Sequence, residues 1–387
     1  MTFPFTRREV RLDNWRAHPF NTWSFQNVAE LVPVAELPCG GGEIERSPGA
    51  DGLADLRLTA PDGRVLTALR HLEASHGDAF VALRDGRIVA EWYAPHCDAL
   101  RPHLVFSVTK SVTGILAGIA AGEGLLDPDA PTAEYVETRA GSAFADARVR
   151  DLLDMTVSLR FEENYLDRES DFDRYRRAML WNPERAAGAE ETLHAVLAAL
   201  PRDDRAHGTR FHYASPVTDM LGLVLEAATG MRYRDWLRDR LWMPMGARGA
   251  ANITVDREGT ARAAGGLSLT ARDLARFGQL VLDDGLVTGV RIVPASWIAD
   301  MRGGGNRAAW LDGDFATLFP DGRYRSCWYD TGDGKGSLAA IGIHEQWIWI
   351  DPSRGVVLVK MSSRPEPSHD PSTMREVAML SQIAAAI

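Results

Sequence analysis

The sequence has few cysteines and no metal-ligand spacing, and each absence narrows the class of protein. Cysteine occurs three times in 387 residues, at Cys39, Cys97 and Cys327, with no CxxC pair. So few scattered cysteines cannot form the disulfide framework of a small secreted domain or a zinc-finger site. The ten histidines include no HExxH or comparable pair. This argues against a metal-dependent hydrolase, and we expect neither a metal nor an organic cofactor.

Long hydrophobic runs and excess positive charge are also lacking. The longest apolar stretch, ILAGIAA within 115–121, is far too short to span a bilayer. The N-terminal residues contain no apolar signal-peptide core. A net charge of −10 and a pI near 5.5 argue against a nucleic-acid-binding face. We therefore expect a cytoplasmic protein without membrane or nucleic-acid partners. Its eleven tryptophans are compatible with a homodimer but do not require one.

Strand and helix patterns predict an α+β protein. Residues 79–94 alternate on both sides of Asp85-Gly86, which predicts a hairpin, and residues 347–363 predict a second one. Helical patterns cover 107–124, 149–155, 215–230, 269–282 and 372–387.

These elements suggest how the chain is divided. Residues 1–70, rich in proline and glycine, are expected to be an extension packed on the body. Residues 71–110 and 240–387 would form a sheet region, and residues 111–239 a mainly helical region. We expect one catalytic unit, with its cleft where the two regions meet.

Lysine is rare, and its placement carries the functional hypothesis. Of 43 lysines and arginines only Lys110, Lys335 and Lys360 are lysines. Lys110 follows Ser107 by three residues in an apolar helical stretch, so both side chains share one face. A serine hydroxyl needs a base, and a buried lysine with a lowered pKa can serve, whereas arginine effectively never deprotonates. We predict Ser107 as nucleophile and Lys110 as its base.

The alternative is that this Ser-x-x-Lys spacing arose by chance. One such match would be expected by chance at ordinary serine and lysine frequencies. Here Lys335 and Lys360 are preceded at the same distance by Gly332 and Val357, so the match is unique. Burying a charged lysine in so apolar a stretch is unfavourable, so its presence there indicates a function. Both points favour the catalytic interpretation.

Tyr213 is the third candidate. Tyr213-Ala214-Ser215 directly precedes the helix predicted from residue 215. A tyrosine beside a lysine can relay protons between nucleophile and leaving group. On its own, the pattern is better explained by an aromatic anchor at the helix entry, with Ser215 as N-cap.

Together these motifs resemble the penicillin-recognising serine hydrolases, which carry S-x-x-K, then Y-x-N or Y-x-S, then a K-T-G-like triad. The resemblance runs from about residue 75 to the C-terminus and implies a β-lactamase/transpeptidase-like fold. Within IGIHEQ (341–346), Gly342 aligns with the triad glycine, so Ala340 replaces the lysine that binds penicillin carboxylates. This stretch is more similar to 6-aminohexanoate-dimer hydrolases, relatives of the family VIII carboxylesterases. By this analogy the Ser107 and Ile343 amides form the oxyanion hole.

The same resemblance implies substrate-binding residues. Tyr165 and Trp181 fall where that subfamily has aromatic residues over the cleft, although they are equally explained as anchors of a surface loop. His344 is either a substrate contact or a histidine satisfied at the strand edge. We also assign Tyr329 to substrate binding. Two further departures from the subfamily are Arg176, where amide-cleaving members can hold an acid against the substrate's ammonium, and Ala264, which offers no polar side chain.

The resulting hypothesis is a serine hydrolase that forms an acyl-enzyme with small carboxylic esters or linear amides. One alternative is a β-lactamase or DD-peptidase-like enzyme. Another is a non-catalytic ligand-binding or sensor protein on the same fold.

Overall fold

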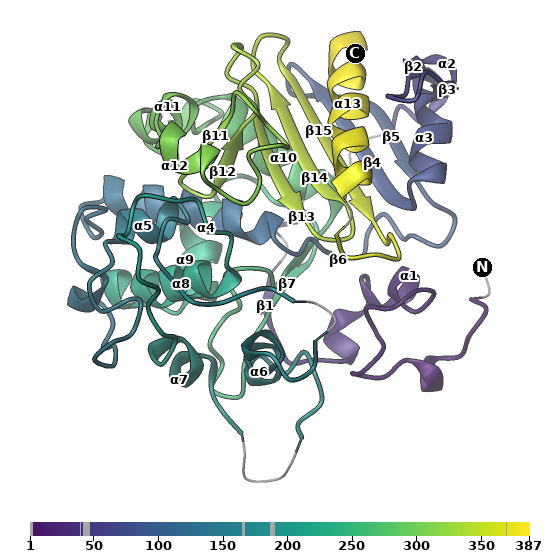
Figure 1. Cartoon of the computed structure of the whole chain (residues 1–387). Helices are drawn as coiled ribbons and strands as arrows, with labels where there is room; N and C mark the ends of the chain where they lie inside the picture. The colour runs from purple at the N-terminus through teal and green to yellow at the C-terminus, as the bar shows by residue number, and fades with distance from the viewer. Residues whose placement is uncertain (1–2, 39, 42–46, 165–166, 186–189, 369) are drawn as a thin grey trace.

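The protein is described here by a computed structural model, which covers residues 3–38, 40–41, 47–164, 167–185, 190–368 and 370–387. Its centre is an antiparallel seven-stranded sheet built from both ends of the chain (Figure 1). In spatial order the strands are β11 (Arg323–Arg325), β12 (Trp328–Asp330), β13 (Leu338–Gly342), β14 (Gln346–Asp351), β15 (Val356–Ser362), β4 (Gly77–Arg84) and β5 (Arg87–Tyr93).

Both hairpins predicted from the sequence are confirmed. β4 and β5 are joined at Asp85 and Gly86, which both have positive φ, as a two-residue hairpin turn requires. β14 and β15 form the second hairpin, and β15 pairs with β4. This last pairing joins strands that are more than 250 residues apart in the sequence.

Helices cover both faces of this sheet. Figure 1 shows α13 (Asp370–Ala386) in front of it and α10 (Ala271–Leu282) behind it. The Thr270 side chain caps α10 by accepting a hydrogen bond from the amide of Asp273, as the sequence pattern indicates. α13 buries one face, containing Met379, Leu380 and Ile383, which confirms the amphipathic closing helix. The α+β class predicted from the sequence is confirmed.

The remaining helices gather mainly beside the sheet (Figure 1). They are α4 (Val108–Gly122), α5 (Val149–Leu153), α6 (Asp171–Ala178), α7 (Leu193–Ala198), α8 (Ser215–Thr229), α9 (Tyr233–Leu237), α11 (Ala295–Gly303) and α12 (Arg307–Leu311). α4 is buried along nearly its whole length and contacts α8 as well as β12, β13 and β14. It therefore joins the helical part to the sheet. Gly230, in the left-handed conformation, ends α8 as predicted.

A four-stranded sheet links the N-terminal residues to the functional region. Its order is β1 (Val34–Leu37), β7 (Ala251–Thr254), β8 (Leu267–Leu269) and β6 (His103–Leu104). The N-terminal segment also contains α1 (Asn21–Ser24), α2 (Asp51–Asp55) and α3 (Ala68–Ala74), with β2 (Arg57–Thr59) paired to β3 (Val65–Thr67). These elements are too short to give a clear periodic signal in the sequence.

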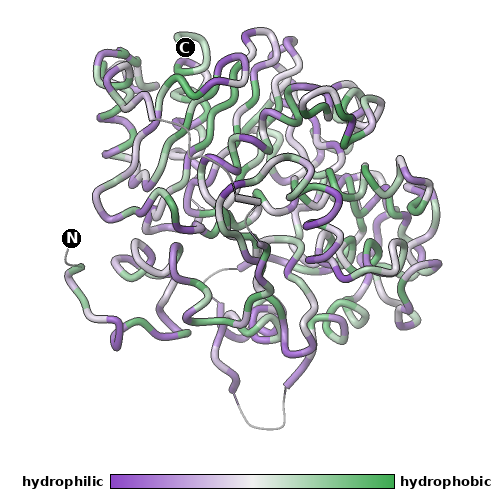
Figure 2. Tube along the Cα trace, turned by 180° about the vertical axis from the view of Figure 1, so that it is seen from behind, coloured by the Kyte–Doolittle hydropathy of each residue, from purple (hydrophilic) through white to green (hydrophobic). Residues whose placement is uncertain are grey.

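The hydropathy pattern agrees with this arrangement. Figure 2 shows hydrophobic segments running through the middle of the molecule and hydrophilic segments at its outer loops. Within the described part of the chain, no helix is long and apolar enough to cross a membrane.

Candidate active site

Ser107 lies where the small sheet meets α4. Strand β6 pairs with β8, and the chain turns after it so that Ser107 takes the N-cap position of α4. The turn depends on Phe106, whose φ of 45° lies in the left-handed region. Such a conformation costs a non-glycine residue about 1–3 kcal/mol and persists only where packing imposes it. The site is therefore held by tertiary contacts rather than by local preference.

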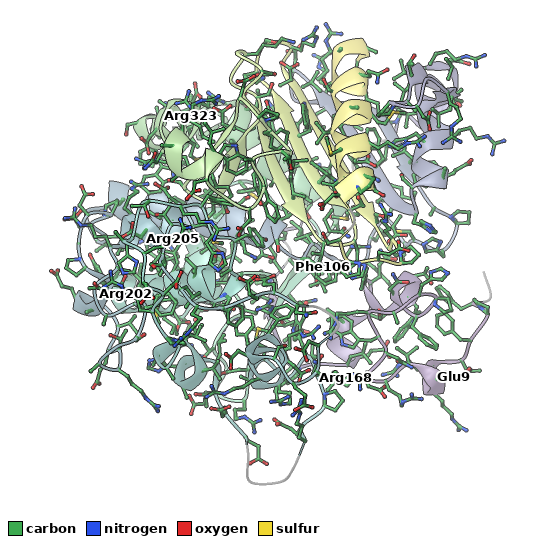
Figure 3. The ribbon with its side chains drawn as sticks, in the orientation of Figure 1. Glu9, Phe106, Arg168, Arg202, Arg205 and Arg323 are labelled. Carbon is green, nitrogen blue, oxygen red and sulfur yellow. The ribbon has the colours of Figure 1, made fainter. Side chains whose placement is uncertain are left out.

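Those contacts come from aromatic rings around Phe106, which Figure 3 locates between the large sheet and the helical part. The Phe106 ring centroid lies 4.8 Å from Phe25, 5.3 Å from His344 and 6.0 Å from Trp181. These partners come from the N-terminal segment, the turn after β13 and the segment after α6. The turn that carries Ser107 is thus held by three parts of the chain that lie far from it in the sequence.

Lys110 lies one turn into α4, with its amine against Ser107. Its Nζ donates to Ser107 Oγ at 3.0 Å, to Ser215 Oγ at 3.0 Å and to the Ala264 carbonyl at 2.8 Å. The side chain is 1% exposed. Burial lowers the pKa of Lys110 to about 8, although Glu163 opposes this shift. An appreciable neutral fraction of this amine therefore exists near neutral pH.

Tyr213 approaches the same two groups from the loop before α8. Lys110 Nζ lies 4.9 Å from the Tyr213 ring centroid, and the Ser107 side chain is close enough to the Tyr213 hydroxyl to lower its pKa. The Tyr213 amide donates to Asp314 Oδ2 at 2.8 Å, which fixes the loop. Burial, reinforced by Glu163, raises the pKa of Tyr213 well above its usual value. The phenol consequently remains protonated and can donate or relay a proton.

Glu163 is a neighbour that the sequence analysis missed. Its Oε1 accepts a hydrogen bond from the Ser215 amide at 2.5 Å, at the start of α8, where a carboxylate is favoured. Ser215 is therefore the first residue of α8 rather than its N-cap, and its hydroxyl accepts from Lys110. The signal available in the sequence was two consecutive glutamates in FEEN (161–164), which by themselves suggest only an exposed turn.

The turn after β13 brings Ile343 and His344 to the site. A Cβ at Gly342 would lie 2.6 Å from the Val105 carbonyl, so only glycine allows the end of β13 this close to the residues before Ser107. Among the described residues, neither the Ser107 nor the Ile343 amide donates a hydrogen bond to a protein acceptor. These two N–H groups therefore remain for a ligand.

His344 is 2% exposed but still borders the pocket. Its Nδ1 lies 2.7 Å from the Arg364 carbonyl, and its amide donates to the Pro367 carbonyl at 2.8 Å. Burial lowers its pKa to about 4, so the ring is neutral at physiological pH. These contacts agree with the strand-edge alternative.

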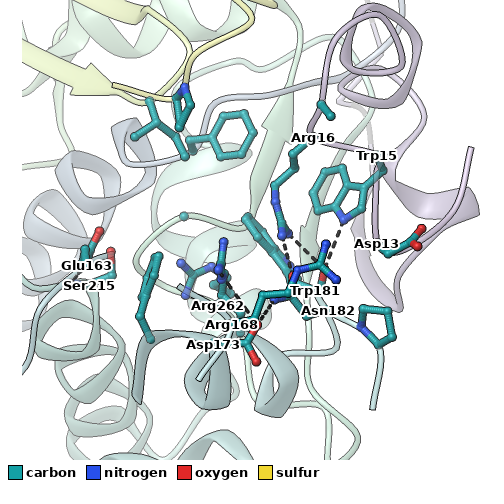
Figure 4. A pocket seen from close by; sticks show the side chains of 18 of the residues that line it. Asp13, Trp15, Arg16, Glu163, Arg168, Asp173, Trp181, Asn182, Ser215 and Arg262 are labelled. Carbon is teal, nitrogen blue, oxygen red and sulfur yellow. Dashed lines mark hydrogen bonds and ion pairs between the residues drawn. The ribbon is translucent and has the colours of Figure 1, made fainter. Parts of the chain in front are cut away.

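A cavity of about 600 Å³ is lined in part by the candidate residues, and Figure 4 shows it from close by with Ser215, Trp181 and Arg262 labelled on its wall. Ser107, Ser215 and Ile343 border it, as do Trp181 and Arg176. Trp15 and Arg16 of the N-terminal segment also line it, and Arg16 donates to the Trp181 carbonyl at 3.0 Å. The segment expected to be an extension packed on the body thus also contributes to the pocket wall. No cluster of three or more possible metal ligands occurs among the described residues.

The other predicted site residues lie in different surroundings. Tyr329 is 5% exposed, packs against Tyr324 and Trp310, and is not among the described residues that line the cavity. Tyr165 lies outside the described residues. Ala264 contributes its carbonyl to Lys110 rather than a side chain.

Arg262 is a further pocket residue that the sequence analysis did not single out. Its guanidinium lies 4.6 Å from the Trp181 ring centroid. The available signal was one arginine among small residues in ARAAGGLSL (261–269), just before a buried strand.

Comparisons with known sequences found a matching family profile and a curated relative. The Beta-lactamase family profile matches residues 65–382. A curated 6-aminohexanoate-dimer hydrolase from Paenarthrobacter ureafaciens is 37% identical over 359 residues, covering 93% of this chain and 89% of the relative.

Solved structures show the same fold. A Bacillus anthracis protein, named provisionally as a 6-aminohexanoate-dimer hydrolase, has a TM-score of 0.88 at 24% identity, covering 100% of this chain and 98% of its own. A family VIII carboxylesterase has a TM-score of 0.59 at 15% identity, covering 83% of this chain and 95% of its own.

Proposed function

This chain belongs to the β-lactamase family of penicillin-recognising serine hydrolases, and from that premise we propose that Ser107, Lys110 and Tyr213 hydrolyse small carboxylic esters or linear amides. The observation that carries the proposal is the 3.0 Å contact between Lys110 Nζ and Ser107 Oγ, made by an amine whose pKa is lowered to about 8. The relative named as a 6-aminohexanoate-dimer hydrolase supports a linear amide or ester over a β-lactam.

In the first half of the reaction, Ser107 Oγ attacks the substrate carbonyl carbon while neutral Lys110 takes the hydroxyl proton. The carbonyl oxygen becomes an oxyanion, which accepts hydrogen bonds from the Ser107 and Ile343 amides. Tyr213 gives its proton to the departing oxygen or nitrogen and recovers one from Lys110. The carbon–heteroatom bond breaks, and the acyl group remains on Ser107.

In the second half, water attacks the acyl-enzyme carbonyl and loses a proton to the Lys110–Tyr213 pair. Ser107 Oγ leaves with that proton, and the carboxylic acid is released. The raised pKa of Tyr213 suits this role, because a phenol that stays protonated can act as an acid. Each step uses groups of this chain and one water molecule.

The test is turnover of 4-nitrophenyl acetate and butyrate, nitrocefin and the 6-aminohexanoate dimer. We expect ester hydrolysis by the wild type and its loss, by about 10³-fold or more, in Ser107→Ala and Lys110→Ala. Tyr213→Phe should slow acylation while leaving the fold intact. Ser111→Ala is the matched control: its buried serine on the same helix donates to the Cys327 carbonyl instead, so activity should stay within about threefold.

Each alternative function predicts a different result in these assays. Ester hydrolysis by Ser107→Ala at the wild-type rate would remove Ser107 as nucleophile. Preferential cleavage of nitrocefin would indicate a β-lactamase. A stable acyl group on Ser107, detected by intact-protein mass spectrometry without product release, would indicate a sensor.

A further inference from the structure

Arg262 is nine-tenths buried in the pocket wall, yet much of its guanidinium is unused by the protein. All its hydrogen bonds to described residues are made by Nη1: to Tyr175 Oη at 2.7 Å, Asp219 Oδ2 at 2.9 Å and Met179 Sδ. Among the described residues, Nε is buried and has no hydrogen-bond acceptor, whereas Nη2 makes none of these bonds and is not among the buried atoms that lack a partner. Nη2 is therefore the donor that a ligand in the cavity can reach. Donors left unpaired in a buried site are costly and call for a partner.

Gly265 keeps this side of the guanidinium open. A Cβ there would lie 3.4 Å from Nε and 3.5 Å from Nη2 of Arg262, nearer than the 3.7 Å to Cζ. Both residues line the cavity. Any side chain at this position would therefore cover Nη2, whereas glycine leaves this donor open to the cavity. Figure 4 shows Arg262 between the Glu163–Ser215 side and Trp181.

The wall around Arg262 carries further guanidiniums. Arg16, Arg168, Arg176 and Arg185 also line the cavity. Arg176 is itself buried and lies over the Phe172 ring, 4.6 Å from its centroid.

The carboxylates on this wall are already engaged by donors. Asp173 accepts from Arg177 and, at 2.6 Å, from Asn182 Nδ2, with Arg185 3.4 Å away and Arg176 4.0 Å away. Glu169 pairs with Arg185 at 2.7 Å.

The outer carboxylates pair with arginines that do not line the cavity. Glu184 pairs with Arg257, and Asp13 lies 3.1 Å from Arg11. Glu163 differs from these arginine-paired carboxylates, because its recorded donor is the Ser215 amide, near the proposed nucleophile Ser107. A ligand cation would thus compete with guanidiniums for nearly every acid, whereas a ligand anion would find an open donor.

The cavity is placed to hold the acyl half of a substrate. It borders Ser107 and Ile343, but Tyr213 is not among the described residues that line it. Because Tyr213 would protonate the leaving group, that group lies on the Tyr213 side. The acyl chain then extends away from it, toward Trp181, Arg176 and Arg262.

We propose that Arg262 Nη2, left open beside Gly265, is the donor of an anion subsite, and that the enzyme prefers substrates whose acyl chain ends in a carboxylate. This inference rests on the proposed hydrolase function and specifies its substrate class. Arg262 acts here as a specificity-determining residue that touches the substrate's end group and takes no part in proton transfer.

The test compares three 4-nitrophenyl esters with six-carbon acyl chains: the hexanoate, the adipate monoester and the 6-aminohexanoate. They share the leaving group and chain length and differ only in a methyl, carboxylate or ammonium end. We expect kcat/KM for the adipate monoester to exceed that for the hexanoate by about tenfold, with the aminohexanoate slowest. The preference for the adipate monoester should fall as sodium chloride is raised, because salt screens the ion pair.

Gly265→Ala tests the subsite without removing a charge. Its methyl group covers the Nε–Nη2 edge, so the adipate-to-hexanoate ratio should fall by about fivefold or more, whatever the change in absolute rates. Arg185→Gln is the control, because it removes a guanidinium of the same cavity that is already bound to Glu169. Its ratio should stay within about twofold of wild type if the open edge, rather than the total charge, sets the preference.

The same experiments show whether the anion-subsite proposal or the hydrolase proposal is wrong. Equal turnover of the three esters, or a preference for the aminohexanoate, would overturn the anion subsite while an inactive Ser107→Ala still supported the serine mechanism. A carboxylate preference that persisted in an active Ser107→Ala variant would overturn the nucleophile and leave the subsite standing. If Gly265→Ala fails to fold, a wild-type ratio insensitive to salt would overturn the subsite.

Discussion

The charge of Glu163 should set the pH at which the enzyme becomes active. Under the proposed mechanism Lys110 can act as a base only when neutral, so kcat/KM should rise with pH and level off above the Lys110 pKa of about 8. Burial lowers this pKa, while the Glu163 carboxylate raises it. Removing that negative charge takes away a stabiliser of the protonated amine. Glu163→Gln should therefore move the rise in activity to lower pH.

The size of the expected shift in the pH profile follows from the Lys110 pKa of about 8. A lysine of ordinary pKa 10.5 would be about 0.03% neutral at pH 7, whereas a pKa of about 8 gives about 9%. A nearby partly buried carboxylate typically shifts a pKa by about one unit. Lowering the Lys110 pKa to about 7 would leave it half neutral at pH 7. We thus expect the midpoint of the profile to fall by about one unit and kcat/KM at pH 7 to rise by about fivefold.

The assay is kcat/KM for 4-nitrophenyl acetate between pH 5.5 and 10. The substitution is nearly isosteric, and a glutamine oxygen can still accept from the Ser215 amide, so the geometry should persist. Glu162→Gln is the matched control, since it removes a neighbouring exposed carboxylate. A midpoint that stayed in place or rose in Glu163→Gln would refute the assignment of Lys110 as the titrating base.

Two further predictions concern stability. A Cβ at Gly118 would lie 2.5 Å from Trp297 Cδ1, so Gly118→Ala should lower the free energy of unfolding by about 1–3 kcal/mol. Gly52→Ala, where no atom lies within 4 Å of the new Cβ, should be neutral or stabilising by up to about 1 kcal/mol; similar urea midpoints for the two would contradict this packing. The fully buried Lys360 Nζ donates to Glu376 Oε2 at 2.6 Å, so Lys360→Met should cost about 3–5 kcal/mol in urea unfolding, because the buried carboxylate loses its ammonium partner and keeps His71, 3.1 Å away. Adding Glu376→Leu should recover part of that loss, and a double variant less stable than the single one would argue against the ion-pair explanation.

Much of the fold could be predicted because its signals are local. Asp85-Gly86 indicates a hairpin, since those residue types tolerate the positive φ that the turn needs. Thr270 and Gly230 mark helix ends through capping chemistry confined to a few residues. The short strands of the N-terminal segment were missed, because Val34–Leu37 becomes a strand only by pairing with the distant Ala251–Thr254.

The residues of the candidate site likewise include some that the local sequence predicts and others that only folding brings together. Ser107 and Lys110 are three residues apart on one helix, so their meeting follows from helix geometry. Tyr213 could be connected to them only through resemblance to a known family. Glu163 and Arg262 were missed, because each acquires its neighbours by folding.

The sequence by itself determined the hairpins, the main helices and the contact of a serine with a lysine, because these depend on backbone preferences over a few residues. Tertiary structure alone decided how basic that lysine is, since its pKa follows from burial and from Glu163, far along the chain. It also decided which groups face the substrate. Trp15 reaches the cavity from the N-terminal segment, and the Arg262 edge is open only because Gly265 has no side chain. Burial and the packing of distant segments depend on the whole chain, so no local pattern could specify them.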